Sequence, residues 1–93
     1  MQTFNVAIPT QLRSYTQGAA RIKAIVDAES PRLRDVFAAL DARFPGIRFR
    51  MIDEAGKVRP HVQVFVGMSV QRDPDALLKP GDEIMIVGAL SGG

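Results

Sequence analysis

Cysteine and tryptophan are both absent from this 93-residue chain, which holds one histidine and one tyrosine. Without a thiol the chain can form no disulfide bond, and it can carry no persulfide or thioester on its own side chains. Any sulfur chemistry in which the protein takes part must therefore use another group. Hydrophobic residues make up 46% and charged residues 24% of the chain, which is typical of a folded globular protein and argues against intrinsic disorder.

Long apolar runs and a strong charge of one sign are also missing. No stretch approaches the roughly 20 apolar residues of a membrane-spanning helix, and the first residues do not resemble a signal peptide, so we expect a cytoplasmic protein without a membrane partner. The 12 basic and 10 acidic residues leave a net charge of +2, too small to indicate a nucleic-acid partner. The densest basic stretch, 43–59, is interrupted by Asp53 and Glu54. We interpret it as a solvated charged face in preference to a phosphate-binding patch.

No catalytic or metal-binding constellation is evident. The single histidine, His61, falls in a predicted strand with no serine, cysteine or carboxylate at a suggestive spacing. The sequence has no glycine-rich phosphate loop and no histidine and carboxylate set with metal-ligand spacing. The adjacent pairs Asp53-Glu54 and Asp82-Glu83 occur in predicted turns, where solvation explains them. The sequence therefore argues against catalysis by the chain itself, and we expect neither a bound cofactor nor a metal.

The clearest predicted element is a helix over 31–44. Ser30 can accept a hydrogen bond from an early helical amide, and Pro31 suits the first helical position. Pro45-Gly46 is expected to stop the helix. An apolar stripe at helical spacing is best interpreted as core, and its members are Leu33, Val36, Phe37, Leu40 and Phe44.

Alternating apolar residues predict strands on both sides of this helix. Segments 3–8 and 20–26 are expected to form an antiparallel hairpin, because Pro9 ends the first and a loop with Gly18 leads into the second. The segment 47–51 is compatible with an extended or a helical piece. The rest of the chain predicts a turn over 53–57, a third strand over 61–66, a short return from Val70, a helical turn over 73–78, a tight turn over 79–83 and a last strand over 84–88.

These elements predict one α+β domain over residues 1–93. A helix with an apolar stripe needs one face of a sheet to cover, and a mixed sheet of four to five strands satisfies that need. The first and last strands can lie side by side and parallel at the centre, because the helix and later segments supply a long crossover. The expected fold is the ubiquitin-like β-grasp, in which the C-terminal strand is central and residues 89–93 leave it as a free, flexible tail.

The C-terminal block, ending in Gly92-Gly93, carries a further signal. Glycine has no Cβ, so such an end is thin enough to enter a narrow enzyme channel and present its carboxylate, although a frayed terminus or a cloning scar would leave the same dipeptide. The block resembles the signature of the MoaD/ThiS family of ubiquitin-like sulfur carriers. The matching parts are Leu77-Leu78-Lys79-Pro80-Gly81-Asp82-Glu83-Ile84, the apolar strand that follows, a small-residue arm and the terminal Gly-Gly.

The resemblance extends over the whole chain. The strand before Pro9, the Leu12-Arg13 pair and the helix that ends at Pro-Gly also fit the family. Gly67 stands where relatives often have asparagine, a difference confined to a hairpin turn. The length and the segments 56–59 and 72–73 are most similar to the CysO-like branch, which serves cysteine biosynthesis.

The resemblance implies a protein co-substrate and not an enzyme. An E1-like adenylyltransferase with ATP and magnesium would adenylate the Gly93 carboxylate, a sulfur source would convert it to a thiocarboxylate, and a synthase would accept the sulfur. Three alternatives stay open: the small subunit of molybdopterin synthase, a ubiquitin-like modifier conjugated to lysines through Gly93, and an interaction module with an unmodified tail. The part of the tail that enters the partner active sites would be Ala89, Leu90, Ser91 and Gly92.

Strand alternation also predicts a partner-binding patch. If the isoleucines of the last strand face the helix, Met85 and Val87 face the opposite way beside the root of the tail, together with Phe65 from the third strand. Contiguous exposed apolar residues usually mark a partner site. Coverage by the segment 48–57 or by a second copy is the competing interpretation. We expect the free protein to be a monomer.

Overall fold

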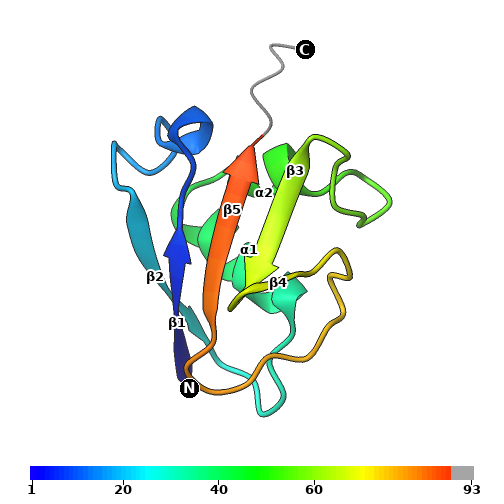
Figure 1. Ribbon diagram of the computed structural model, residues 1–93. Coiled ribbons are helices and arrows are strands. Elements are labelled where there is room, and N and C mark those ends of the chain that lie inside the picture. The colour runs from blue at the N-terminus through cyan, green and yellow to red at the C-terminus, as the bar shows by residue number, and fades with distance from the viewer. Residues whose placement is uncertain (89–93) are drawn as a thin grey trace.

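A five-stranded sheet organises the protein, whose computed structural model describes residues 1–88. The strand order is β2-β1-β5-β3-β4, so the last strand lies at the centre (Figure 1). β1 and β5 are parallel, whereas the other neighbouring strands are antiparallel. This mixed sheet confirms the predicted β-grasp arrangement. The strands are β1 Gln2–Ala7, β2 Arg21–Val26, β3 Val62–Val66, β4 Ser69–Val70 and β5 Glu83–Gly88.

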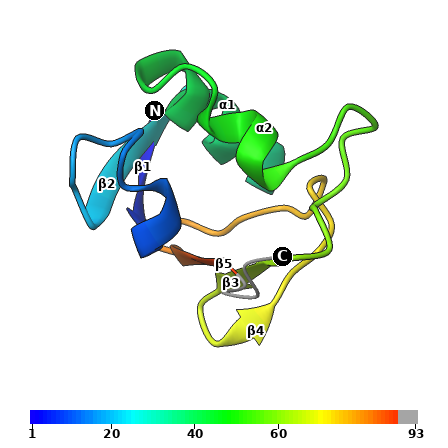
Figure 2. The same cartoon turned by 90° about the horizontal axis from the view of Figure 1, so that it is seen from above.

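Two helices, α1 (Leu33–Arg43) and α2 (Ile47–Met51), lie on one side of this sheet, as Figure 2 shows. α2 settles the ambiguous segment 47–51 as a short helix, and Gly46 joins it to α1 with a φ of 97°, which a side chain would disfavour. A one-turn 3-10 helix, η1 (Thr10–Leu12), follows β1 and leads into the turns around Gly18. The predicted helical stripe is buried, except that Phe44 is only partly covered: Leu33, Val36, Phe37 and Leu40 form the core with inward-facing strand residues.

α1 begins at Leu33 and not at Pro31, so the predicted helix start was wrong. Ser30 and Pro31 lie outside the helix, and Arg32 precedes it in an extended conformation. The carboxylate of Asp35 accepts a hydrogen bond from the Arg32 backbone N–H at 2.8 Å, as in one half of a capping box. The early helical amides that the serine was expected to satisfy donate to the chain beside them instead: the Leu33 N–H donates to the Ala76 carbonyl at 3.0 Å and the Arg34 N–H to the Pro74 carbonyl at 2.7 Å.

The segment 73–78 is not the helical turn that the sequence predicts. It forms a single turn, closed by the Ala76 N–H that donates to the Asp73 carbonyl at 3.0 Å, and then continues extended. The Leu78 N–H donates to the Pro31 carbonyl at 2.8 Å, so this segment pairs with the chain just before α1. Because that pairing holds residues 31–32 extended, it also explains why the helix starts late.

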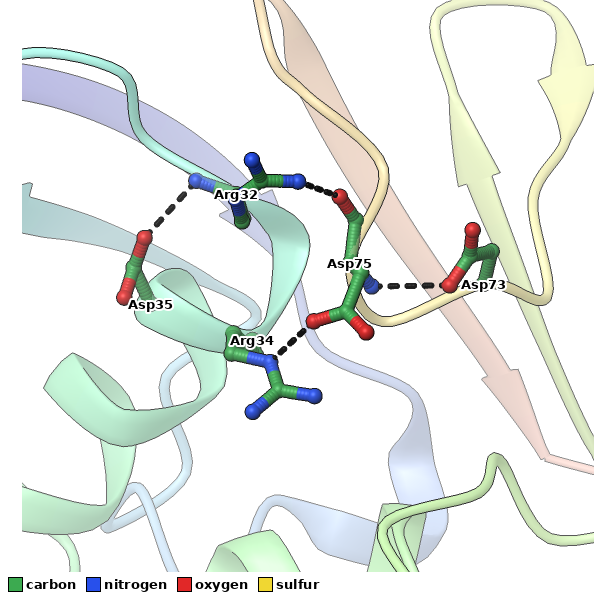
Figure 3. A network of polar contacts seen from close by, with 5 residues as sticks. All are labelled: Arg32, Arg34, Asp35, Asp73 and Asp75. Carbon is green, nitrogen blue, oxygen red and sulfur yellow. Dashed lines mark hydrogen bonds and ion pairs between the residues drawn. The ribbon is translucent and has the colours of Figure 1, made fainter.

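Charged side chains connect the segment 73–78 to the start of α1 through hydrogen bonds and an ion pair (Figure 3). Arg32 donates through Nη1 to the Asp75 carbonyl at 2.6 Å, and Arg34 forms an ion pair with the Asp75 carboxylate. Asp73 accepts a hydrogen bond from the Asp75 N–H at 2.9 Å, which shapes the turn. The ion pair itself is exposed and contributes little. The hydrogen bonds to backbone atoms are what set the path of the chain toward β5.

Arg72 connects the segment after β4 to the start of β3 and the loop before it. Its Nη1 donates to the Val62 carbonyl at 3.0 Å, and its Nη2 donates to the carbonyls of Val58 at 3.0 Å and Arg59 at 3.2 Å. The planar guanidinium thus satisfies three backbone acceptors from one direction, which a lysine ammonium cannot reproduce.

We predict that Arg72→Ala lowers the free energy of unfolding by about 2 kcal/mol, because it leaves these carbonyls without their charged donor. Arg72→Lys should recover less than half of the loss. Urea denaturation measures both, with Arg34→Ala as a control that removes an exposed arginine whose ion pair contributes less than about 1 kcal/mol. Equal losses for Arg72→Ala and Arg34→Ala would contradict a stabilising role for the three Arg72 hydrogen bonds.

Candidate functional site

The C-terminal end of the central strand marks the root of the predicted tail. β5 ends at Gly88, which pairs with Val62 of β3 and whose carbonyl accepts a long hydrogen bond of 3.4 Å from the Gln11 side chain. β5 therefore ends at the edge of the sheet that also carries η1 and the start of β3, which lie on either side of it (Figure 1). The predicted tail residues Ala89, Leu90, Ser91, Gly92 and Gly93 lie outside the described residues.

The outward side of the sheet carries the predicted apolar residues on neighbouring strands. Met85 and Val87 are 44% and 39% exposed, whereas the two isoleucines of β5 are buried against the helix. Phe65 stands directly opposite Met85 in the β3–β5 register and is half-buried. Val70 of β4 stands opposite Phe65 and is exposed. We call these four residues the outer patch, and Val70 is a member that the sequence prediction missed.

The segment 48–57 does not cover the outer patch. It begins in α2, which packs beside α1 on the opposite side of the sheet (Figure 2). No other segment among residues 1–88 lies across the outward side of β3 and β5 in that view. One of the two competing interpretations of the patch is therefore excluded for the described part of the chain.

A pocket of about 350 Å³ opens beside the root of the tail, on the helix side of β5. Its apolar lining comes from Leu12, Val62 and Ile86, all of them buried. Sequence reasoning did not find this pocket, because its walls come from four segments that only the fold brings together. Its polar and remaining lining residues are Pro9, Gln11, Ser14, Tyr15, Arg50, His61 and Gly88, and we call it the tail-root pocket.

His61, the single histidine, is exposed at this pocket beside Arg50. None of the residues that line the tail-root pocket is a carboxylate, and the hydroxyls of Ser14 and Tyr15 belong to the turns after η1. Residues 1–88 contain no group of three or more histidine, cysteine or carboxylate side chains placed to hold a metal ion. The same residues include no helix with the length and apolarity to cross a membrane.

The carboxylate of Asp53 serves the turn that the sequence predicts over 53–57. Its Oδ1 accepts hydrogen bonds from the backbone N–H groups of Lys57 at 3.0 Å and Ala55 at 2.9 Å. These hydrogen bonds lower the pKa of Asp53 below its usual value, and the bond from the Lys57 N–H has the largest effect. The positive charge of the nearby Arg59 lowers this pKa further. Turn geometry thus accounts for Asp53, which needs no catalytic explanation.

Comparison with known protein families identifies the family to which the chain belongs. The ThiS family matches residues 6–93. The chain belongs to the ThiS family. This confirms the resemblance to ubiquitin-like sulfur carriers that the C-terminal block indicates. A comparison with curated proteins gave no match.

Solved structures agree with this assignment. A chain of the Amycolatopsis orientalis BexX/CysO complex is 27% identical, with a TM-score of 0.82 over 97% of this chain and 99% of that one. Mycobacterium tuberculosis CysO is 26% identical, with a TM-score of 0.79 over 94% of this chain and 99% of that one. SAMP1 from Haloferax volcanii is 20% identical, with a TM-score of 0.81 over 98% and 99% of the two chains, and shows the shared fold alone.

Proposed function

We propose that this protein is a sulfur carrier for cysteine biosynthesis, activated at the carboxylate of Gly93. The placement of β5 carries the proposal: the central strand of a ThiS-family fold ends at the rim of the sheet, and Gly93 stands five positions beyond Gly88. Similarity to two CysO-containing structures at 26% and 27% identity favours the cysteine branch.

The proposed chemistry uses only the terminal carboxylate of this chain. A carboxylate oxygen attacks the α-phosphorus of ATP in an E1-like enzyme with magnesium, which releases pyrophosphate and leaves an acyl-adenylate at Gly93. Hydrosulfide then attacks the carbonyl carbon and loses its proton to solvent, so that a C–S bond forms while the C–O bond to the phosphate breaks and AMP leaves. The thiocarboxylate sulfur then bonds to an electrophilic acceptor on a synthase, and hydrolysis of the Gly93 C–S bond restores the acid and leaves the sulfur on the acceptor as a thiol. Because the chain has no cysteine, its own side chains offer no thiol for this task.

The receiving enzyme separates this function from its alternatives. The thiocarboxylated protein is expected to support cysteine formation by a cysteine synthase of the O-phosphoserine type. Sulfur transfer by a molybdopterin synthase large subunit instead would assign the chain as the small subunit of that enzyme. Isopeptide bonds between Gly93 and target lysines in cells would assign it as a ubiquitin-like modifier. A chain that no activating enzyme modifies would be an interaction module.

The outer patch is proposed as the surface that positions the tail in these enzymes. We predict that Phe65→Ala raises the concentration of carrier needed for half-maximal pyrophosphate release by about tenfold, because apolar anchors carry most of the binding free energy. Since Phe65 is only half-buried, the free energy of unfolding should fall by less than about 2 kcal/mol.

Ile25→Ala is the matched control for this prediction. Ile25 is also exposed, but it pairs with Thr3 at the end of the sheet far from the tail root. Its replacement should leave the half-maximal concentration within about twofold of the wild type. A larger effect from Ile25→Ala, or severe unfolding of Phe65→Ala, would show that the outer patch has a different role.

A further inference from the structure

Two arginines within the basic stretch 43–59 are held in fixed orientations. Arg50 donates through Nε to the Tyr15 hydroxyl at 2.6 Å, and its guanidinium carbon lies 5.7 Å from the centre of that ring. Arg59 donates through Nε to the Phe49 carbonyl at 2.6 Å. Within residues 1–88 neither arginine uses Nη1 or Nη2 in a hydrogen bond. Each guanidinium is therefore held in place through Nε, while its Nη1 and Nη2 groups are available to donate hydrogen bonds to another molecule.

These two guanidiniums share a small pocket with the single histidine. Arg50, Arg59, His61 and Phe49 line a volume of about 230 Å³, and no carboxylate is among them. Arg50 and His61 are exposed and Arg59 is half-buried, so the pocket opens to solvent. Guanidinium groups with a free outer edge match the two oxygens of a carboxylate or phosphate. We call Arg50, Arg59 and His61 the basic pole.

The basic pole lies next to the point where the tail begins. Arg50 and His61 also line the tail-root pocket, which extends to Gly88. Five extended residues span at most about 17 Å, so Gly93 can reach an active site only if the enzyme surface comes that close to Gly88. Any enzyme that takes the tail must therefore approach the basic pole and the tail-root pocket.

We propose that the basic pole docks an acidic segment of the E1-like activating enzyme, with an apolar side chain of that segment in the tail-root pocket. This inference rests on the proposed sulfur-carrier function. The surface belongs to α2 and to the loop before β3, on the helix side of the sheet, whereas the outer patch is on the opposite side (Figure 2). The enzyme would then contact the protein at the basic pole and at the outer patch, on opposite sides of the sheet. Contacts on both sides would fix the orientation in which the tail is presented to the enzyme.

Exposure of the basic pole favours a protein carboxylate over a free anion as its occupant. A single solvent-exposed ion pair contributes little binding free energy, so a lone small anion would be held only weakly. A segment with several carboxylates instead gains from charge complementarity, which raises the rate of association and fixes the register. The apolar floor of the tail-root pocket, formed by Leu12, Val62 and Ile86, adds a contact that a small anion cannot make.

Paired charge reversals test this docking surface. Arg50→Glu/Arg59→Glu and the control Lys23→Glu/Lys79→Glu each change the net charge by four units, from +2 to −2. Lys23 on β2 and Lys79 in the turn before β5 are exposed and lie outside both pockets. The first pair should raise the carrier concentration for half-maximal pyrophosphate release by at least about tenfold at low salt, and the difference should shrink near 0.5 M salt because of screening (roughly 4–5 Å Debye length).

The control pair should remain within about threefold of the wild type, and both double variants should reach the same final yield of thiocarboxylate at saturating enzyme. Arg50→Gln/Arg59→Gln provides a milder version that keeps hydrogen-bonding side chains, and it should lose about threefold. Thermal unfolding of every variant separates a docking effect from a folding defect.

Equal weakening by the two charge-reversed pairs would overturn the proposal, since net charge alone would then explain the effect. Unchanged enzyme affinity, combined with saturable binding of inorganic phosphate detected through the Arg50 and Arg59 Nε–H NMR signals, would assign the pocket to a free anion and also overturn it. In both of these outcomes the wild-type protein still forms a thiocarboxylate. Failure of the wild type to do so at any enzyme concentration would instead overturn the carrier function, and the docking surface with it.

Discussion

Gly92→Val is expected to abolish activation of the protein while leaving its free energy of unfolding unchanged. The described residues already supply a buried hydrophobic core that runs in sequence from Phe4 to Ile86, so we expect the domain to fold whatever residue stands at position 92. A β-branched side chain next to Gly93 would widen a segment that must pass through the enzyme channel. Misplacement of the carboxylate by about 1 Å costs roughly a hundredfold in rate, and we expect at least that loss in pyrophosphate release.

Two further variants serve as a control and as an independent test of the same argument. Ser91→Ala adds no bulk to the tail and should stay within about twofold of the wild type. Deletion of Gly93 moves the carboxylate back by about 3.5 Å and should prevent activation as completely as Gly92→Val. Normal pyrophosphate release by Gly92→Val would contradict the steric argument, and unfolding of either tail variant would contradict the independence of fold and tail.

Phe37→Ala should have the largest effect on stability, a loss of about 3–5 kcal/mol in the free energy of unfolding. Phe37 lies on the face of α1 that packs on the sheet, and its side chain is fully buried. Its removal takes away buried apolar area and leaves a cavity between helix and sheet that the close-packed neighbours fill only in part. Since small domains are stable by only about 5–15 kcal/mol, the variant should be marginally folded at room temperature.

Phe49→Ala is the matched control, because it is the same substitution in a side chain that is 50% exposed on α2. Its cost should be less than about 1.5 kcal/mol. Urea denaturation of both variants measures the difference. Similar losses for Phe37→Ala and Phe49→Ala would mean that α1 does not pack on the sheet as described.

Sequence periodicity was sufficient to predict the central architecture. Strand alternation assigned Met85 and Val87 to one side of β5 and the isoleucines to the other, because a half-buried strand repeats every two residues. The stripe at helical spacing predicted the buried face of α1 for the corresponding reason. Together they led to a sheet with the last strand at its centre, which the observed strand order confirms.

Tertiary hydrogen bonds account for what the sequence prediction got wrong. Ser30 and Pro31 have the local character of a helix start, but the Leu78 N–H donates to the Pro31 carbonyl and holds that residue outside α1. The same pairing makes the segment 73–78 extended after its first turn. Local propensity describes neighbours along the chain, and these partners are more than 40 residues apart, as the Arg32–Asp75 hydrogen bond illustrates.

The basic pole could not be predicted for a related reason. The sequence shows Arg50, Arg59 and His61 as ordinary members of a charged stretch. Their shared pocket depends on the Tyr15 hydroxyl, from the loop after η1, and on the Phe49 carbonyl at α2. Which arginines are anchored, and which edges remain available, is decided by contacts between separate segments.

Intact-mass analysis tests the central claim most directly. The protein is incubated with an E1-like adenylyltransferase, ATP, magnesium and sulfide, and its mass and C-terminal peptide are then measured. The sulfur-carrier account predicts a gain that matches replacement of one oxygen by sulfur, located at Gly93 and dependent on ATP. An unchanged mass, a gain located elsewhere in the chain, or a native protein that continues untrimmed beyond Gly93 would contradict it.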